Sequence, residues 1–546
     1  MGEALYLRPD VQTEPLVDQW YAWSHLIPPA TTARNITHRH FRIMESYLNA
    51  PHAHADAVRS PKMLGGPFVD YEGRRVDEIR ALRDRTKQSR AALLELSSAL
   101  ERLDEMLRTK PDGHSLHPHY ADVPETLRGY VELVYDIRHN ATFRLIEPLL
   151  YKSRLYDRSA QSLMLSITAG DERPFAMSTP RLESPESVHF RWAFDDPRVD
   201  ELFRLKTTPR PWRWIKDRLE VPDAADVAFR SMLTPDSPPP YRPYSGSGVR
   251  WRYFGHACVL VETRDLTILF DPVLSYTYES GIPRYTYADL PDRIDYVLIT
   301  HNHQDHVLIE TLLQLRHKIG QVVVPKGGSG AIQDPSLKLT LENIGLRNVC
   351  ELGEFEALPL SDGSIVGLPF LGEHSDLAVS TKLAFAVRLG SEQLLFAADS
   401  CNVEPRLYDH VHAAVGDAGT LFIGMECDGA PLSWLYGPLM LRPLDRRLDH
   451  SRRLNGSDCA QAMAVVERFR CRDVYVYAMG QEPWLNHVMS LKYSAQSRPI
   501  VESNKLLQEC RQRGIVAERL FGEKEILIDR VAREPLIHAH ARSPAA

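Results

Sequence analysis

The chain has 546 residues, of which 43% are hydrophobic and 25% charged, an ordinary balance for globular proteins. At about 150 residues per domain, this length allows two to four domains, and it can bury a large core without disulfide staples. The formal net charge is −7 and the pI is about 6.3, which argues against the basic surface of a nucleic-acid-binding protein. The composition therefore excludes a small disulfide scaffold and a wholly disordered chain.

Neither a membrane span nor a secretory leader is expected. No run of about 18 apolar residues is present, and Met1–Pro15 lacks an apolar segment. The seven cysteines are scattered without paired spacing, which favours free thiols in a reducing compartment. We therefore expect a cytoplasmic protein that does not associate with membranes.

Residues 1–236 are expected to form a mixed α+β domain. Apolar residues recur at helical spacing over Val76–Leu107 and predict a long amphipathic helix. A second helix is predicted from Pro124 through Ile137, because proline suits a first helical turn. Alternating apolar residues predict strands over Leu163–Ile167 and Val188–Phe194. No motif with recognisable chemistry is found in this half.

A segment rich in proline and glycine, residues 237–248, predicts a linker. Beyond it strands alternate with helices, which predicts a layered α/β domain over residues 249–531, followed by a frayed tail at 532–546. Its first elements are a strand pair over Arg250–Glu262 and, later, an apolar strand over Ile294–Thr300.

The strongest chemical signal is His-Asn-His-Gln-Asp-His at residues 301–306, directly after that apolar strand. Imidazole nitrogens and a carboxylate are ligands of transition metals. His301 and His303 can bind one ion, while Asp305 and His306 can turn toward a second. An incidental surface cluster is the alternative, but such clusters rarely follow a buried strand. The motif therefore predicts a dinuclear metal site.

This motif resembles the signature of the metallo-β-lactamase fold, an αββα sandwich. Gly255–Ala257 and Leu269–Pro272 are similar to the opening hairpins of that fold. The fold places further ligands at later strand ends, and this sequence offers matches there. The resemblance implies a ligand set consisting of His301, His303, Asp305, His306, Glu373, Asp399 and His487, with Asp399 shared by both ions.

The third position of this set is open, because Glu373 and His374 are adjacent. Neighbouring residues that leave a strand point to opposite sides, so only one of them is expected to bind metal. With Glu373 the set is rich in carboxylates, which shifts preference from zinc toward iron or manganese. With His374 the set reverts to the pattern of a dizinc hydrolase.

The set with Glu373 resembles a narrower family, the diiron β-hydroxylases of nonribosomal peptide pathways in antibiotic biosynthesis. Members join an N-terminal domain of similar length to a metallo-β-lactamase-like domain. The resemblance implies two Fe ions, O₂, and two electrons from an external donor. It also implies a substrate amino acid held as a thioester on the carrier (thiolation) domain of a peptide synthetase, hydroxylated at its β-carbon. Self-association as a homodimer and carrier docking through residues 1–236 are implied as well.

Two other functions remain open at this stage. The first is a zinc or manganese hydrolase of the same fold, such as a lactonase or phosphodiesterase, in which the metals activate a bridging water. The second is a non-catalytic carrier-binding module with a vestigial site. The complete ligand set argues against the second, because a drifting site loses ligands.

Several residues give weaker signals. The resemblance places His256 near the site entrance, although a cap of the hairpin is the alternative. Asp271 ends a strand where it can orient a ligating histidine. Glu426 follows another strand and either faces the metals or is a solvated acid. Three aromatic residues are expected in loops on the ligand side, where they line a cleft or pack on the scaffold: Trp434, Tyr436 and Trp484. A basic cluster is a candidate for docking an acidic carrier, unless it only solvates its helix: Arg74, Arg75, Arg80, Arg83 and Arg85.

Overall fold

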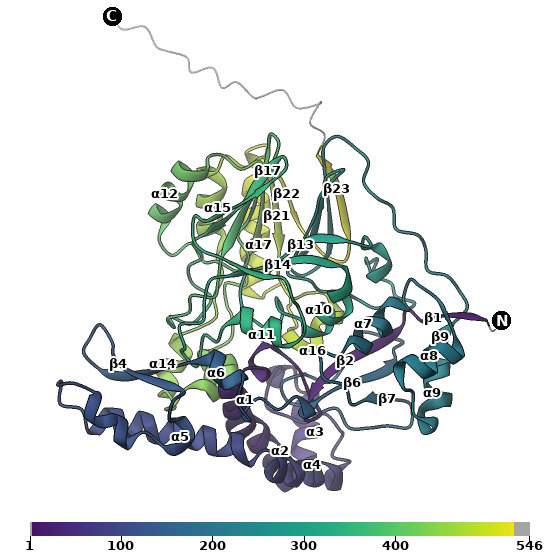
Figure 1. Cartoon of the computed structure of the whole chain (residues 1–546). Helices are drawn as coiled ribbons and strands as arrows, with labels where there is room; N and C mark the ends of the chain where they lie inside the picture. Colours follow the sequence, from purple (N-terminus) through teal and green to yellow (C-terminus); the bar gives the residue numbers. More distant parts are fainter. Residues whose placement is uncertain (1–2, 529–546) are drawn as a thin grey trace, which may run out of the picture.

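The structure is a computed structural model that describes residues 3–528. Its upper part in Figure 1 is a sandwich of two seven-stranded sheets. The first sheet runs in the order β15 (Val349–Leu352), β14 (Ile319–Pro325), β13 (Ile294–Leu298), β12 (Thr267–Phe270), β11 (Cys258–Glu262), β10 (Val249–Gly255) and β23 (Lys524–Ile528). The second runs in the order β16 (Ala357–Leu360), β17 (Gly363–Leu368), β18 (Ala384–Leu389), β19 (Glu392–Phe396), β20 (Thr420–Gly424), β21 (Asp473–Tyr477) and β22 (Val516–Arg519).

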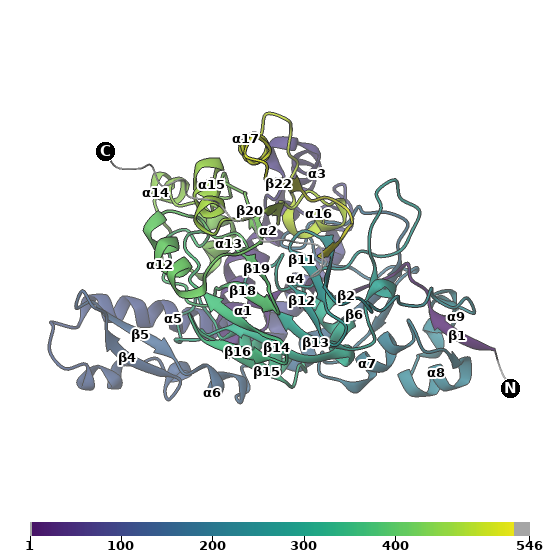
Figure 2. The same cartoon turned by 90° about the horizontal axis from the view of Figure 1, so that it is seen from above.

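An aromatic core joins the two sheets. The Phe270 ring stacks on Phe396 with centroids 3.7 Å apart, and Phe396 stacks on Phe422 at 4.6 Å. Helices cover the outer faces of both sheets. On the first sheet these are α10 (Ile309–Leu315) and α11 (Leu337–Asn343). On the second they are α12 (Pro405–Val415), α15 (Cys459–Arg468) and α17 (Arg498–Gln512) (Figure 2). Apolar strands buried on both faces require such cover. The predicted αββα sandwich is confirmed.

The N-terminal domain lies beneath this sandwich in Figure 1. One sheet has four strands in the order β3 (Trp20–Tyr21), β2 (Val11–Val17), β6 (Gln161–Ile167) and β7 (Val188–Phe190). A smaller sheet has the order β8 (Arg210–Pro211), β1 (Ala4–Leu7) and β9 (Leu233–Thr234). The helices are α1 (Pro29–Asn35), a π-helical turn (Ile36–His40), α2 (Phe41–Asn49), α3 (Pro51–Arg59), α4 (Val76–Ser89), α5 (Ala91–Thr109), α6 (Glu147–Tyr151), α7 (Pro197–Arg204), α8 (Trp212–Leu219) and α9 (Asp226–Ser231).

The helix predicted over Val76–Leu107 forms, but as two helices, α4 and α5, separated at Arg90. Arg90 leaves helical geometry because its buried guanidinium binds the carboxylates of Asp18 and Asp157. The two charge-assisted contacts of Arg90 are therefore more stabilising than the helical hydrogen bonding that is lost at this residue.

The helix predicted from Pro124 through Ile137 is wrong. This segment forms β4 (Val131–Tyr135), which pairs with β5 (Ala141–Leu145) in a hairpin. The Asp136 carboxylate accepts the backbone N–H groups of Arg138 and Asn140 and closes the turn, as short acidic side chains do in turns. The predicted strand over Val188–Phe194 is shorter than expected and ends at Phe190.

A buried polar network joins the two domains. The Glu310 carboxylate on α10 accepts the hydroxyls of Tyr21 and Tyr276 and the guanidinium of Arg173, which also contacts Glu14. Apolar residues from both domains form one continuous core around this network. The segment 237–248 has no helix or strand, yet its Tyr241 hydroxyl donates to Glu262 of β11.

Two simpler expectations can be checked against residues 3–528. All seven cysteines are free, as their spacing predicts. In this described part of the chain, no helix is both long and apolar enough to span a bilayer. The end of the second domain at residue 531 and the tail 532–546 lie outside the described residues.

Candidate metal centre

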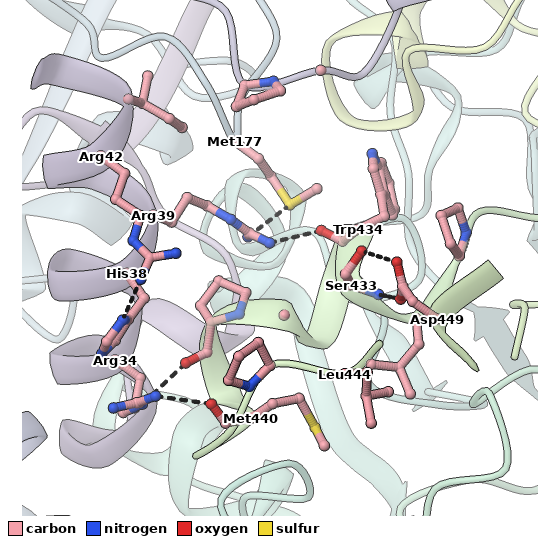
Figure 3. A pocket seen from close by; sticks show the side chains of 18 of the residues that line it. Arg34, His38, Arg39, Arg42, Met177, Ser433, Trp434, Met440, Leu444 and Asp449 are labelled. Atoms are coloured by element: carbon pink, nitrogen blue, oxygen red, sulfur yellow. Dashed lines mark hydrogen bonds between the residues drawn. The ribbon is translucent and has the colours of Figure 1, made fainter. Parts of the chain in front are cut away.

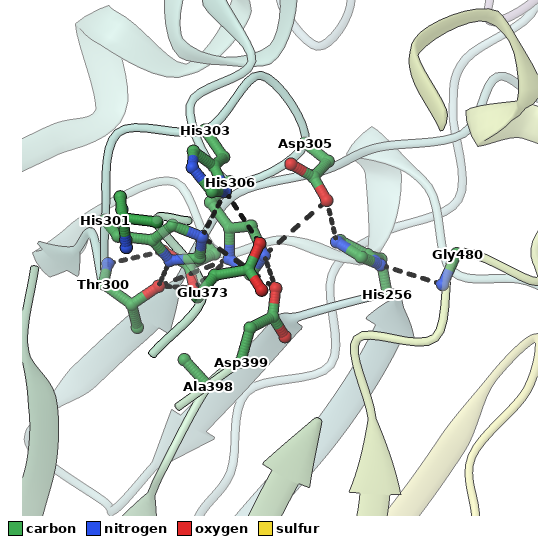
Figure 4. Close-up of polar contacts among 12 residues, drawn as sticks. His256, Thr300, His301, His303, Asp305, His306, Glu373, Ala398, Asp399 and Gly480 are labelled. Atoms are coloured by element: carbon green, nitrogen blue, oxygen red, sulfur yellow. Dashed lines mark hydrogen bonds and ion pairs between the residues drawn. The ribbon is translucent and has the colours of Figure 1, made fainter. Parts of the chain in front are cut away.

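Strand ends on one edge of the sandwich bring all of the predicted ligands except His487 together (Figure 4). The loop carrying residues 301–306 follows β13, Glu373 follows β17, and Asp399 follows β19. All of these side chains are buried. β17 and β19 run in the same direction on either side of the antiparallel β18, and β13 belongs to the facing sheet, so residues distant in sequence converge where these three strands end.

A first group consists of His301, His303 and Glu373, whose ligand atoms all lie within 4.8 Å of one another. The Nε2 of His301 is 3.1 Å from the Nδ1 of His303, which is 3.2 Å from Glu373 Oε1. Two nitrogens and a carboxylate oxygen that converge at this range can share one ion.

A second group surrounds Asp399. Its Oδ2 lies 3.0 Å from His306 Nε2 and 3.9 Å from His301 Nε2, so the carboxylate stands between the two groups. Asp305 Oδ2 is 3.8 Å from the same His306 nitrogen. Asp399 Oδ1 is buried without a hydrogen-bond partner, and a Cβ at Gly424 would lie only 2.4 Å from it. A free oxygen in a space kept open by glycine suits a bridging carboxylate.

Hydrogen bonds behind the histidines fix which ring nitrogen faces the centre. Asp271 accepts both the backbone N–H and the hydroxyl of Thr300, at 2.8 and 2.7 Å. The Thr300 hydroxyl oxygen in turn accepts His301 Nδ1–H at 3.0 Å, and Asp271 accepts His306 Nδ1–H at 2.8 Å. Both Nε2 lone pairs are therefore free for metal, as ligating histidines require. These contacts are the ones that Asp271 needs for its predicted role of orienting a ligating histidine.

The remaining ligating histidine is held by a residue from far along the chain. His303 Nε2–H donates to the hydroxyl of Tyr436 at 3.0 Å, so its Nδ1 lone pair faces Glu373. Tyr436 ends α13 (Leu432–Tyr436) and is fully buried. Tyr436 is among the aromatic residues expected to line a cleft or pack on the scaffold, but no sequence pattern indicates this bond.

His256 contacts the centre through a carboxylate. Its Nδ1 accepts the backbone N–H of Gly480 at 3.2 Å, so in the neutral ring the proton sits on Nε2. That Nε2–H donates to Asp305 Oδ2 at 3.1 Å. His256 therefore orients Asp305 and has no lone pair left for a metal.

Two sequence candidates lie outside the ligand groups. His487 sits on α16 (Asn486–Met489), where its ring packs edge-on against Tyr21 and its Nδ1–H donates to the Trp484 carbonyl. His374 packs its ring beside His303 with centroids 4.5 Å apart, and its Nδ1 contacts a backbone carbonyl. The structure thus brings Glu373, and not its neighbour, to the other ligands.

The electrostatics of the centre fit bound cations. Burial disfavours charge on His306, yet Asp399, Asp305 and Asp271 raise its pKa well above the ordinary value. Burial, together with Asp399 and Glu426, raises the pKa of Glu373 well above the ordinary value. Carboxylates buried this closely repel one another unless positive charge lies between them. The donor set of oxygens and imidazoles suits iron.

Several residues with left-handed backbone conformation lie at the same centre. Glu373, Asp271, Ala398 and His256 have φ values of 63°, 35°, 48° and 52°, a region that residues other than glycine rarely adopt. Such strain persists where the surrounding structure imposes it, commonly at functional sites.

A cavity of about 290 Å³ opens onto the ligands. Glu426 and Asp428 lie in its wall beside the ligands, so Glu426 faces the centre as its position after a strand suggested. Burial and Asp399 raise the pKa of Glu426 to about 8. The rest of the wall is mixed, with the polar side chains of Gln304, Arg453 and Ser490 beside apolar ones: Leu64, Trp434, Leu435, Leu454, Met489 and Leu491. Leu64 comes from the N-terminal domain.

The basic cluster at the start of α4 is locally paired. Arg75 binds Glu78, Arg80 binds Asp77, and Arg83 binds Asp84. The other two members meet Glu72 and Gln19, respectively: Arg74 and Arg85. Exposed pairs of this kind contribute little stability, and they leave these arginines partly neutralised.

Comparison with known proteins agrees with this centre. Residues 6–238 match the family model of the diiron non-heme beta-hydroxylase N-terminal domain, and residues 250–354 match that of the beta-lactamase superfamily domain. The chain is 42% identical over 522 residues to the 4-amino-L-phenylalanyl-[CmlP-peptidyl-carrier-protein] 3-hydroxylase of Streptomyces venezuelae, covering 94% of this chain and 98% of that protein.

Solved structures give the same result. The crystal structure of CmlA, a diiron beta-hydroxylase from Streptomyces venezuelae, superposes with a TM-score of 0.91 at 41% identity, covering 97% of this chain and all of that one. A point mutant of CmlA superposes at 0.88 with 40% identity, covering 96% of this chain. The protein is thus a diiron oxygenase built on a metallo-β-lactamase sandwich. More narrowly, it belongs to the family of CmlA-like β-hydroxylases, which act on amino acids tethered to carrier proteins.

Proposed function

We propose that one iron is bound by His301, His303, Glu373 and Asp399, and the other by Asp305, His306 and the shared Asp399. The observation that carries this assignment is the orientation of the three imidazoles, each of which keeps one nitrogen free toward a carboxylate. His487 is omitted because its ring packs against Tyr21 outside both groups. When bound, the irons supply the oxidising chemistry that uses O₂ and two external electrons.

The substrate we propose is an aromatic amino acid such as 4-aminophenylalanine, held on a peptidyl carrier. The relative of known activity carries this substrate in its name. Apolar side chains along part of the 290 Å³ cavity beside the ligands suit an aromatic ring, and the carboxyl groups of Glu426 and Asp428 can accept hydrogen bonds from a substrate amine. These walls also exclude water and hold the β-carbon close to the ligand groups.

Hydroxylation of loaded carriers tests this function directly. Iron-loaded enzyme is given O₂, a chemical reductant, and carrier loaded with 4-aminophenylalanine, phenylalanine or leucine. Mass spectrometry of the carrier-bound amino acid is expected to show the gain of one oxygen atom with the aromatic substrates and little gain with leucine. No oxygen gain on either aromatic substrate, by enzyme with a full complement of iron, contradicts the proposal.

Substitutions at Glu373 and at its neighbour His374 test the ligand assignment. Glu373→His is expected to shift the metal content from iron toward zinc and to abolish oxygen-dependent turnover. His374→Ala is expected to leave the metal content near normal, because its ring only packs beside His303. The reverse pair of results, measured by elemental analysis, contradicts the assignment and favours the zinc hydrolase.

We also propose an external electron donor and a homodimer. Support for self-association comes from the β4–β5 hairpin, where Ile137 in the turn is 96% exposed. A large apolar side chain at a hairpin tip is suited to burial against another protein surface. Sedimentation of the wild type and of Ile137→Asp, which is expected to weaken the dimer, checks this contact. A monomeric wild type contradicts it.

A further inference from the structure

A second and larger cavity, of about 860 Å³, lies between the two domains. One wall is the continuous helical stretch α1, π-turn and α2, and the other is formed by α13 and by α14 (Arg446–Ser451) (Figure 3). The π-turn interrupts the first wall at Ile36–His40, and such turns occur frequently at functional sites.

Hydrogen bonds across the cavity floor hold these walls together. The buried Arg34 guanidinium donates to the carbonyls of Pro438 and Met440. Arg39 donates to the carbonyls of Trp434 and Leu435. Because these two arginines tie α1 and the π-turn to the segment 434–440, the cavity is formed before any ligand binds.

The positive charge around the cavity is not balanced by its acids. Glu101 is already paired with Arg34 and His38, and Asp449 accepts the N–H and the hydroxyl of Ser433. Two exposed arginines remain at the lining, one from each domain: Arg42 and Arg446. Within residues 3–528 neither has an ion pair, and Arg42 meets only the His38 ring, at 3.4 Å.

This cavity adjoins the one that holds the metal ligands. Gly65, Pro431 and Trp434 line both cavities. The Trp434 indole N–H donates to the Gly65 carbonyl at 3.0 Å, at the boundary between them. Trp434 therefore stands in the wall that the large cavity shares with the cavity of the metal centre.

We propose that the large cavity admits the phosphopantetheine arm of the carrier, with its phosphodiester bound by Arg42 and Arg446. The inference rests on the proposed function, because only a carrier-tethered substrate brings this arm. A phosphodiester is a single negative charge, and planar guanidinium groups bind it with paired hydrogen bonds. The arm beyond it alternates amide and apolar groups, and the wall offers both the apolar side chains of Met177 and Leu444 and the hydroxyl of Ser46.

Binding of carriers with and without the arm tests this proposal. Holo-carrier and apo-carrier of the relative's pathway are titrated into iron-loaded wild type, Arg42→Gln, Arg446→Gln and Arg447→Gln. Arg447 is the matched control, because it is exposed on the same helix α14 but does not line the cavity. Metal content and melting temperature confirm that each variant is folded.

The wild type is expected to bind holo-carrier more tightly than apo-carrier. Each of Arg42→Gln and Arg446→Gln is expected to weaken holo-carrier binding about tenfold, the usual effect of losing one hydrogen bond to a charged group. Apo-carrier binding is expected to stay unchanged, and Arg447→Gln to match the wild type throughout. The KM for loaded carrier is expected to rise in parallel at constant kcat.

Two results overturn the inference. If both cavity variants retain wild-type affinity for holo-carrier, the phosphate does not bind there. If they lose affinity for apo-carrier equally, the arginines contact the body of the carrier and not its arm. A wild-type enzyme that hydroxylates no loaded carrier refutes the proposed function instead, so the two failures are distinguishable.

Discussion

Asp271 offers the sharpest test of how the chain prepares its metal site. Its side chain is completely buried, and its two oxygens accept the backbone N–H and hydroxyl of Thr300 and the Nδ1–H of His306. In Asp271→Asn, one of these acceptors becomes an NH₂ group that faces donors. If this amide donates to His306 Nδ1, the ring proton moves to Nε2 and blocks the nitrogen assigned to iron.

The expected magnitude follows from the role of such outer contacts. Loss of the group that orients a ligating histidine typically weakens metal affinity 10–100-fold, which corresponds to about 1.4–2.7 kcal/mol. Iron affinity is measured by competition with a coloured chelator, and the melting temperature of metal-free protein separates loss of affinity from loss of fold. Asp265→Asn, on the exposed turn before β12, is the control. An affinity of Asp271→Asn within twofold of the wild type would refute the reasoning.

Three further outcomes follow from the structure. Burial raises the pKa of Glu147 from 4.5 to about 7, so the folded state holds a proton that the unfolded state has lost, and stability falls as pH rises between these values. The Glu147→Gln side chain can still accept the Ser336 N–H but carries no charge. In denaturant unfolding this variant is therefore expected to be about 3 kcal/mol more stable than the wild type at pH 8, and equally stable near pH 4.5. Equal stability of the two proteins at pH 8 contradicts this. Tyr436→Phe leaves the His303 Nε2–H without an acceptor, and it is expected to weaken iron binding about tenfold in the chelator assay. Unchanged iron affinity would show that this hydrogen bond does not orient His303. Asp399→Ala is expected to lose both irons by elemental analysis, and a retained pair of ions would refute the bridge.

Much of the second half could be predicted because its information is local. An apolar strand followed by closely spaced ligands places those ligands at a sheet edge whatever the rest of the chain does, as with residues 301–306. The orienting position of Asp271 follows from the same logic, since it ends the neighbouring strand β12. Glu373 could not be separated from His374 by sequence alone, because the choice depends on a left-handed backbone at Glu373.

The failures have a different physical origin. Apolar residues from Leu127 to Ile137 fit a helical period by coincidence, and the turn-forming Asp136 decides for a hairpin. His487 follows a strand as expected, but tertiary packing turns its ring toward Tyr21. The large cavity joins residues near 40 to residues near 440, and no local sequence pattern indicates that proximity.

The two domains cannot be treated as separable parts, and this changes how the first half should be tested. Removing residues 1–236 would take Tyr21 and Arg173 away from Glu310, leaving that carboxylate on α10 without two of its partners. It would also open the apolar core that both domains share. Breaking a buried charged pair by removing one side is strongly destabilising, by about 3–5 kcal/mol. If a truncated protein showed no turnover, the cause could therefore be lost stability as well as lost contact with the carrier. Substitution of an exposed cavity arginine such as Arg42 leaves the shared core intact, so a change in holo-carrier affinity there reports on carrier binding and not on lost stability.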